Sequence, residues 1–168
     1  SYMMRRSKTS GWNPKARYPY LADLIAEMGR HGRKTGRGWY RYDGTSGNPI
    51  SDPEFAAITA KYQKENNIVP RSFTDKEILE RCLLAAVNEA AHILQEGKAL
   101  RASDIDAMWL NGFAFPRHRG GIMHYADQIG LKHVYDKICV FYQEMGEQWA
   151  PSNLLKDMTE KGERFTDF

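Results

Sequence analysis

The chain has 168 residues, of which 42% are hydrophobic and 12% are aromatic. This length and composition predict a folded, soluble protein with one ordinary domain or two small ones. No stretch approaches the roughly 20 uninterrupted apolar residues of a membrane-spanning helix, and the basic residues 1–15 have no apolar region behind them. We therefore expect neither a membrane span nor a secretory signal.

The net charge of +3 results from 24 basic and 21 acidic side chains and weakly favours an anionic ligand. The basic excess lies between Arg5 and Arg41. A nucleic-acid surface is one interpretation, but a solvated basic face is the commoner outcome of such a run, so we expect no nucleic-acid partner. Cys82 and Cys139 each lie in an apolar helical pattern, which predicts reduced thiols packed as small hydrophobes and an intracellular compartment.

The first predicted helix covers residues 20–30, where apolar side chains recur at helical spacing before Gly29 and Gly32. The run Lys-Thr-Gly-Arg-Gly-Trp-Tyr-Arg-Tyr at residues 34–42 combines glycines that permit tight turns with three aromatic side chains. Residues 43–48 are rich in Gly, Ser and Asn and predict an exposed loop.

A second, weaker helix is predicted next, with Ser51 as its cap, Pro53 near its first turn and Asn66-Asn67 at its end. We interpret this helix as a connector. Pro70 predicts an extended segment over residues 68–72, because the residue before a proline disfavours the helical region.

The strongest helix signal begins at Thr74, which has capping-box spacing to Glu77, and Gly97 ends the helix. A helix of about six turns needs a partner surface, because an isolated helix gains too little stability by itself. The predicted apolar stripe comprises Ile78, Cys82, Ala85, Ala86, Ala90, Ile93 and Leu94.

Shorter helices are predicted downstream, and they should cover this stripe. The predicted helices are one capped by Ser103 with Asp106, one over residues 122–129 opened by Gly120-Gly121, one over residues 131–145, and one over residues 153–161 capped by Ser152. No segment alternates convincingly as a strand. We therefore predict an all-α fold, with a helical bundle from about Phe73 onward and a smaller helical piece before it.

The five histidines do not predict a metal site, because His118 and His124 are six residues apart and no second His or Cys completes a zinc-like spacing. His118 and His124 could instead act with Asp127 in catalysis. No serine or cysteine lies nearby in the sequence as a nucleophile, and we expect no catalytic residue in this chain.

The run Pro-Arg-His-Arg-Gly-Gly at residues 116–121 places two arginines at a predicted helix start, which suits a phosphate or a carboxylate. The same run also fits a loop that docks the helix tightly, with glycine where a side chain would not fit. We find no Gly-x-Gly-x-x-Gly run after a strand, so the sequence shows no phosphate-binding turn of a dinucleotide fold.

Two parts of the chain resemble the helical C-terminal domain of 3-hydroxyacyl-CoA dehydrogenases. Residues 34–42 are similar to its closing motif, a Lys-Thr-Gly-x-Gly-aromatic-Tyr run after a short helix. Residues 80–97, 103–106, 112–117 and 120–130 are similar to its opening. Since the closing motif comes first, the chain resembles the multifunctional fatty-acid-oxidation enzymes (enoyl-CoA hydratase/3-hydroxyacyl-CoA dehydrogenase) that carry two such domains in tandem.

The resemblance implies a division into three parts: residues 1–48 as the end of a first C-terminal-type domain, residues 49–72 as a connector helix and linker, and residues 73–168 as a second such domain. It also implies oxidation of a (3S)-3-hydroxyacyl-CoA to the 3-oxoacyl-CoA with hydride transfer to NAD, with a His-Glu pair as general base and its orienter. That pair belongs to an NAD-binding domain that this sequence lacks. We therefore expect the chain to complete the acyl-CoA cleft, to pack domains together and to be inactive alone.

The implied partners are the acyl-CoA substrate, the missing N-terminal NAD-binding domain, and a thiolase or a second copy. In the family, the lysine of the Lys-Thr-Gly run reaches the bound nicotinamide cofactor, so Lys34 is the one predicted cofactor-binding residue. The family also contacts substrate through an asparagine next to an arginine. Glu80-Arg81 stands at the matching position, and because a carboxylate cannot donate that hydrogen bond, we interpret the second copy as structural.

A free-standing helical dimerisation or interaction module is the alternative function. The predicted compartment is the cytoplasm, because the sequence ends in Phe-Thr-Asp-Phe rather than in a Ser-Lys-Leu type of peroxisomal address.

Overall fold

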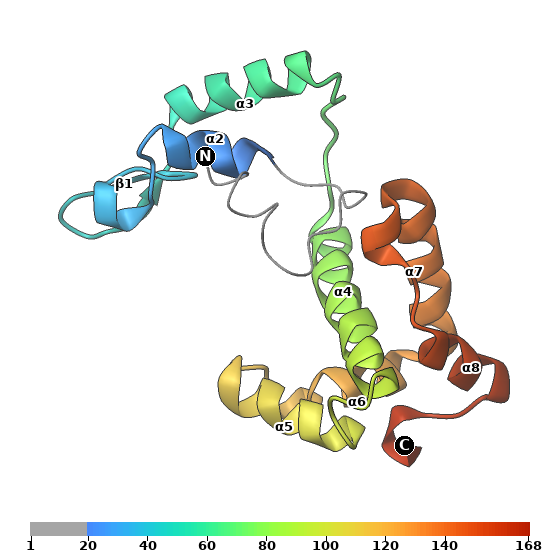
Figure 1. Ribbon diagram of the computed structural model, residues 1–168. Helices are drawn as coiled ribbons and strands as arrows, with labels where there is room; N and C mark the ends of the chain where they lie inside the picture. Colours follow the sequence, from blue (N-terminus) through green and yellow to red (C-terminus); the bar gives the residue numbers. More distant parts are fainter. Residues whose placement is uncertain (1–19) are drawn as a thin grey trace. The chain divides into compact units, whose positions relative to one another are not determined.

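The computed structural model describes residues 20–168, which fall into two compact units, residues 20–72 and residues 73–168 (Figure 1). The basic residues 1–15, and with them the first part of the predicted basic excess, lie outside the described residues.

The described residues form seven α-helices, which confirms the predicted all-α class. In the first unit these are α2 (Tyr20–Glu27) and α3 (Pro53–Glu65). In the second unit they are α4 (Asp75–Gln95), α5 (Ala102–Gly112), α6 (Ile122–Ile129), α7 (Leu131–Met145) and α8 (Asn153–Lys161). Single 3₁₀ turns lie at η1 (Arg33–Thr35), η2 (Arg117–Arg119), η3 (Glu147–Trp149) and η4 (Phe165–Asp167). Within residues 20–168, no helix combines the length and the apolar character that a membrane span requires.

Helix α2 stops where its glycines predict. Gly29 adopts a left-handed conformation with φ of 74°, which glycine tolerates without a Cβ penalty. The amide of Gly29 donates to the carbonyl of Ala26, and the amide of Arg30 donates to the carbonyl of Ile25, each at 3.0 Å. These two bonds form the Schellman motif that satisfies the last carbonyls of a helix.

A short hairpin follows α2, and the expectation of no strand is wrong at this point. Strand β1 (Arg41–Tyr42) pairs antiparallel with β2 (Pro49–Ile50). Each strand has two residues, which is too short for an alternating pattern to show in the sequence. The mostly exposed loop between them is the one predicted at residues 43–48, and the carboxylate of Asp43 accepts the amide and the hydroxyl of Ser46 at 3.1 and 2.7 Å.

The cap of α3 is Asp52 and not the predicted Ser51. Its Oδ1 accepts the amide of Glu54 at 3.1 Å, and Pro53 occupies the first helical position, where its missing N–H leaves no bond unmade. The cap therefore lies one residue later than predicted. The helix ends at Glu65, before Asn66, as the sequence indicates.

Helix α4 begins as predicted, because the Thr74 hydroxyl accepts the amide of Glu77 at 3.2 Å. The predicted apolar stripe is displaced, however, since Ile78, Cys82 and Ala85 are exposed. The buried face instead comprises Leu84, Val87, Asn88, Ala90, Ala91 and Leu94. Periodicity defines the candidate stripes of a helix, but the neighbouring helices decide which stripe is covered.

The two cysteines are free thiols, and only one of them resembles the prediction. Cys82 is exposed on α4, so it does not pack as a small hydrophobe, whereas Cys139 on α7 is partly buried.

The core of the second unit lies between α4 and the helices that follow it. Helix α4 packs against α6, α7 and α8, and α5 packs against α6 (Figure 1). The ring of Phe141 on α7 meets the ring of Trp149 edge-on, with centroids 4.7 Å apart. The largest fully buried side chains are Phe165, Leu84, Ile122, Met123, Ile138, Leu155, Val87 and Val134.

A buried asparagine joins α4 to the start of α8. The Asn88 amide group donates to the carbonyl of Ala150 at 2.8 Å and accepts the amide of Ser152 at 3.0 Å. Ser152 caps α8 as predicted, with its hydroxyl 3.5 Å from the amide of Leu155. Both polar groups of the Asn88 side chain are thereby satisfied in the interior.

Candidate functional site

Lys34, the predicted cofactor contact, lies in a rigid turn of the first unit. Turn η1 is bounded by Gly32 and Gly36, whose φ angles are 87° and 71°. The Thr35 hydroxyl accepts the amide of His31 at 2.9 Å and donates to the carbonyl of Arg37 at 3.0 Å. Within residues 20–168, the exposed Lys34 side chain has no hydrogen-bond or ion-pair partner, so its charge is free to meet a ligand.

The second glycine of the Lys-Thr-Gly-x-Gly run, Gly38, allows the backbone to pass close to the backbone of Gly32. A Cβ on Gly38 would lie 2.8 Å from the Cα of Gly32, which no side chain permits. The glycine spacing therefore folds the chain back on itself and fixes the turn that carries Lys34.

A buried arginine anchors this turn to α3. The side chain of Arg30 is 4% exposed, and its guanidinium pairs with Asp52 and, at 3.2 Å, with Glu54. Its Nε donates to the carbonyl of Gly38 at 3.1 Å, and Arg37 also reaches Glu54, at 3.2 Å. Such a buried pair holds its geometry because further hydrogen bonds complete it. Sequence analysis missed this cluster, since Arg30 and Asp52 are 22 residues apart.

We expect the first unit to lose stability in acid through Asp52. The hydrogen bond from Arg30 lowers the pKa of Asp52 below its ordinary value. Because the folded pKa is lowered, the stabilisation is fully present above the unfolded value of about 3.9 and disappears as the pH falls through the folded pKa. Urea unfolding at pH 6 and at pH 2.5, followed by the NMR signals of residues 20–72, measures the change.

The pKa of Asp43 is also lowered, chiefly by the hydrogen bond from the Ser46 hydroxyl, and it adds a pH dependence of the same sign. The D52N variant serves as the control, because it removes the ionisable group but keeps an oxygen at the cap. D52N should have a lower free energy of unfolding than the wild type at pH 6, and this free energy should depend less on pH. An unchanged pH dependence in D52N would contradict the assignment to Asp52.

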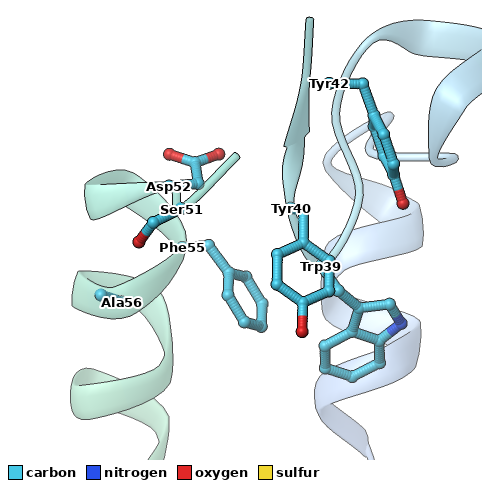
Figure 2. A pocket seen from close by; sticks show the side chains of 7 residues that line it. All are labelled: Trp39, Tyr40, Tyr42, Ser51, Asp52, Phe55 and Ala56. Atoms are coloured by element: carbon cyan, nitrogen blue, oxygen red, sulfur yellow. The ribbon is translucent and has the colours of Figure 1, made fainter. Parts of the chain in front are cut away.

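A pocket of about 410 Å³ opens beside the same turn. Figure 2 shows Trp39 and Tyr40 facing Phe55 on α3, and the rings of Trp39 and Phe55 meet edge-on at 5.3 Å. The lining comprises Trp39, Tyr40, Tyr42, Ser51, Asp52, Phe55 and Ala56. Aromatic walls suit contact with an apolar or planar group, and the carboxylate in the lining, that of Asp52, is already paired with Arg30.

In the second unit, the basic run at residues 116–121 is a docking loop. The amides of Met123 and His124 at the start of α6 donate to the carboxylate of Asp106, at 2.7 and 3.1 Å. The positive end of α6 therefore already faces a carboxylate of the same unit. Desolvation raises the pKa of Asp106, and the two amide bonds act in the opposite direction.

The glycines of this run stand where a side chain would not fit. A Cβ on Gly120 would overlap the ring of His124, and a Cβ on Gly121 would overlap the side chain of Asp106. The sequence predicted that Asp106 would help to cap α5, but this residue caps α6. Helix α5 begins at Ala102 and has no side-chain cap at its start.

The described contacts of His124 and Asp127 are with other groups and do not join them to each other or to His118. The carboxylate of Asp127 accepts the amides of Phe165 and Thr166 at 2.8 and 2.9 Å. The ring Nε2 of His124 lies 3.0 Å from the side-chain nitrogen of Gln128, and His118 is exposed. Within residues 20–168, no group of His, Cys, Asp and Glu side chains is placed to hold a metal ion.

Glu80 and Arg81, which replace the asparagine–arginine pair of the resemblance, both contribute to packing of α4 against α7. Glu80 lies 3.4 Å from the ammonium of Lys137. Arg81 pairs with Glu144 at 2.8 Å, and its guanidinium lies 4.5 Å from the ring centroid of Phe141. The charged groups of Glu80 and Arg81 are thus both paired with side chains of the same unit.

Comparison with known proteins adds a family and a set of relatives. The family model of the 3-hydroxyacyl-CoA dehydrogenase C-terminal domain matches residues 78–165. The peroxisomal bifunctional enzyme of Homo sapiens is 41% identical over 149 residues, which cover 87% of this chain and 21% of that protein. The peroxisomal fatty acid beta-oxidation multifunctional protein of Oryza sativa subsp. japonica is 32% identical over 145 residues, which cover 84% of this chain and 20% of that protein.

The chain thus spans about a fifth of the length of the curated relatives that it matches. Among solved structures, the dehydrogenase part of multifunctional enzyme 1 from C. elegans aligns with a TM-score of 0.62 and 23% identity. That alignment covers 93% of this chain and 35% of the other, and it supports the fold.

Proposed function

This chain belongs to the 3-hydroxyacyl-CoA dehydrogenase C-terminal domain family, and we propose that it is the C-terminal part of a multifunctional enzyme of fatty-acid β-oxidation. The proposed reaction is the NAD-dependent oxidation of a (3S)-3-hydroxyacyl-CoA to the 3-oxoacyl-CoA. The observation that carries the proposal is the match of the family model to residues 78–165, which follow the Lys-Thr-Gly-Arg-Gly turn in the sequence. Relatives named as bifunctional or multifunctional β-oxidation enzymes support it.

We propose a positioning role for this part of the enzyme. In the described residues, the carboxylates of Asp106 and Asp127 accept backbone amides of the second unit, and that unit is a packed bundle. The chain therefore fits the wall of an acyl-CoA cleft and a contact between domains, while the general base would lie in an NAD-binding domain outside these residues. The proposed partners are the acyl-CoA substrate, that domain, and a thiolase or a second copy.

The chain alone should have no dehydrogenase activity. When the chain is incubated with acetoacetyl-CoA and NADH, the absorbance of NADH should decrease only at the background rate, because the residues that transfer the proton are absent. The longer protein should oxidise NADH under the same conditions. Turnover that increases with the concentration of the 168-residue chain would contradict this expectation.

Lys34 is proposed to contact the nicotinamide cofactor. NAD accepts the hydride when it is bound, and a free ammonium on a rigid turn suits one polar contact to it. In the longer protein, K34A should raise the KM for NAD by about tenfold to a hundredfold, since a hydrogen bond to a charged group contributes roughly 1.5–3 kcal/mol.

K61A is the matched control, because Lys61 is an exposed lysine of the same unit and its one ion pair within residues 20–168 is with Glu65 on its own helix. It should leave the KM for NAD unchanged. Equal effects of K34A and K61A would reject a specific contact at Lys34.

The compartment stays a prediction. Sequence analysis predicts the cytoplasm, whereas the relatives are named as peroxisomal or glyoxysomal proteins. Fluorescence microscopy of the tagged longer protein, with a peroxisomal marker, distinguishes the two.

A free-standing dimerisation module is the second candidate function. It is favoured by apolar side chains near the start of α4, where Ile78 and Leu79 are 50% and 57% exposed. Light scattering of the 168-residue chain tests it, since a stable dimer would support this candidate and a monomer would count against it.

A further inference from the structure

The aromatic pocket of the first unit, with a volume of about 410 Å³, has the size of a small-molecule site. Its walls are the rings of Trp39 and Tyr40, from the segment before β1, and of Phe55 from α3 (Figure 2). Trp39 and Tyr40 are 47% and 53% exposed, although tryptophan is on average a highly buried residue. Much of both side chains is therefore available to a ligand that enters the pocket.

The walls of this pocket are held together by contacts within the first unit. The ring of Trp39 meets the ring of Phe55 edge-on at 5.3 Å, and the carbonyl of the preceding Gly38 accepts a hydrogen bond from buried Arg30. Arg30 also pairs with Asp52, which caps α3, so one side chain joins both walls. A pocket that is already ordered loses less conformational freedom when a ligand binds.

The lining of the pocket also carries three hydroxyl groups, on Tyr40, Tyr42 and Ser51. None of the three has a hydrogen-bond partner among residues 20–168. Each hydroxyl can donate one hydrogen bond and accept others, which matches the ring nitrogens and amino group of a heterocyclic base. An apolar chain in the same place would remove water from these hydroxyls without replacing its hydrogen bonds.

The edge of the pocket carries a positive charge that this chain does not neutralise. The guanidinium of Arg33 lies 5.8 Å from the centroid of the Tyr42 ring, and no carboxylate of residues 20–168 pairs with it. The neighbouring acids, Asp52 and Glu54, are both already paired with Arg30. A guanidinium beside an aromatic ring suits a phosphate, which it can bind through two parallel N–H bonds.

We propose that this pocket binds a purine nucleotide. The base stacks on the exposed rings of Tyr40 and Trp39, the hydroxyls of the lining bind its polar edge, and the phosphates bind Arg33. The rings alone would accept any planar group, but the hydroxyls favour a heterocycle and Arg33 favours an anion. All of these residues lie between positions 33 and 56, so the proposal goes beyond the dehydrogenase role and requires no other domain.

The test is a titration of the ¹⁵N-labelled 168-residue chain with ADP at constant ionic strength, followed by NMR. ADP should shift the indole N–H signal of Trp39 and the amide signals of residues 39–42 and 51–56 in a saturable manner. The indole signals of Trp109 and Trp149, in the second unit, should not respond.

Two variants at Tyr40 separate the ring from its hydroxyl. Y40A should weaken ADP binding about tenfold, because stacking of a base on one aromatic ring is lost. Y40F keeps the ring and should weaken binding about threefold or less. Tyr40 is half exposed, so neither variant removes a core side chain, and an unchanged spectrum of the second unit verifies that the chain is folded.

The phosphate contact is tested with adenosine and with two arginine variants. Adenosine should bind about tenfold more weakly than ADP, and R33A should weaken ADP binding to the level of adenosine while leaving adenosine binding unchanged. R41A is the matched control. Arg41 is also exposed, but it precedes Tyr42 in β1, and successive side chains of a strand point to opposite faces. R41A should therefore bind ADP nearly as tightly as the wild type.

Separate titrations with ADP, NAD and coenzyme A identify the source of the nucleotide. Binding of NAD or coenzyme A at least as tightly as ADP would assign the pocket to that coenzyme, whereas tighter binding of ADP would assign it to a free nucleotide. Three results would overturn the proposal: no saturable shift with ADP, binding of UDP as tight as that of ADP, or equal effects of R33A and R41A. Dehydrogenase activity of the longer protein is measured separately, and its absence would refute the proposed function without altering the ADP titration.

Discussion

Replacing Asp127 by alanine should lower the free energy of unfolding of the second unit by about 3 kcal/mol, because hydrogen bonds between amides and a charged acceptor contribute more than neutral ones. Asp127 is 9% exposed and holds the amides of Phe165 and Thr166. Phe165 is fully buried, so its amide cannot turn to water when the carboxylate is removed. Urea unfolding followed by circular dichroism measures the loss as a lower midpoint at an unchanged slope.

The matched control is D136A on the neighbouring helix α7. The Asp136 side chain is 57% exposed and pairs with Lys132 across one helical turn, so its loss should change stability by about 0.5 kcal/mol or less. D127N should fall between the two, since an amide oxygen accepts hydrogen bonds without the charge. Equal midpoints for D127A and D136A would show that the terminal turn is held by the burial of Phe165 alone.

The helices were predictable because their signals are local. Thr74 and Glu77 lie three residues apart, Ser152 precedes its helix directly, and Gly29 supplies its own left-handed backbone. Each of these features can be read within a window of a few residues. That is why the order and type of the helices agree with the sequence, while β1 and β2, at two residues each, do not stand out.

The carboxylates that hold the fold together were not predictable in the same way. Asp106 binds amides 17 and 18 residues later, and Asp127 binds amides 38 and 39 residues later. A capping rule examines positions three residues apart, so it assigned Asp106 to the wrong helix. The partners of these acids are set by tertiary packing.

The turn around Lys34 is an intermediate case. Its glycine spacing predicted a tight turn, and the structure shows that Gly38 must approach Gly32 closely. The buried pair of Arg30 and Asp52 that anchors the turn gave no signal, because two charged residues far apart in sequence resemble many exposed ones. The tight turn that carries Lys34 was thus predictable, and the Arg30–Asp52 pair that anchors this turn was not.

The loop before α6 provides the second large effect. G121A should lower the free energy of unfolding of the second unit by about 4 kcal/mol, through backbone strain and through loss of the α6 cap. The φ of Gly121 is 106°, and a Cβ there would overlap Asp106, whose carboxylate caps α6. Circular dichroism during urea unfolding measures the loss.

G130A separates the two contributions, because Gly130 also has a positive φ, of 90°, but a Cβ there meets no atom within 4 Å. It should cost about 1–2 kcal/mol from strain alone. The double variant G121A/D106A completes a thermodynamic cycle. If the overlap with Asp106 is what makes G121A more costly than G130A, D106A should destabilise the wild type by about 1–2 kcal/mol. In that case, D106A should destabilise the G121A variant much less, because G121A has already displaced the cap. Fully additive losses would mean that Gly121 is required for its backbone conformation alone, and that Asp106 keeps its hold on α6 in the variant.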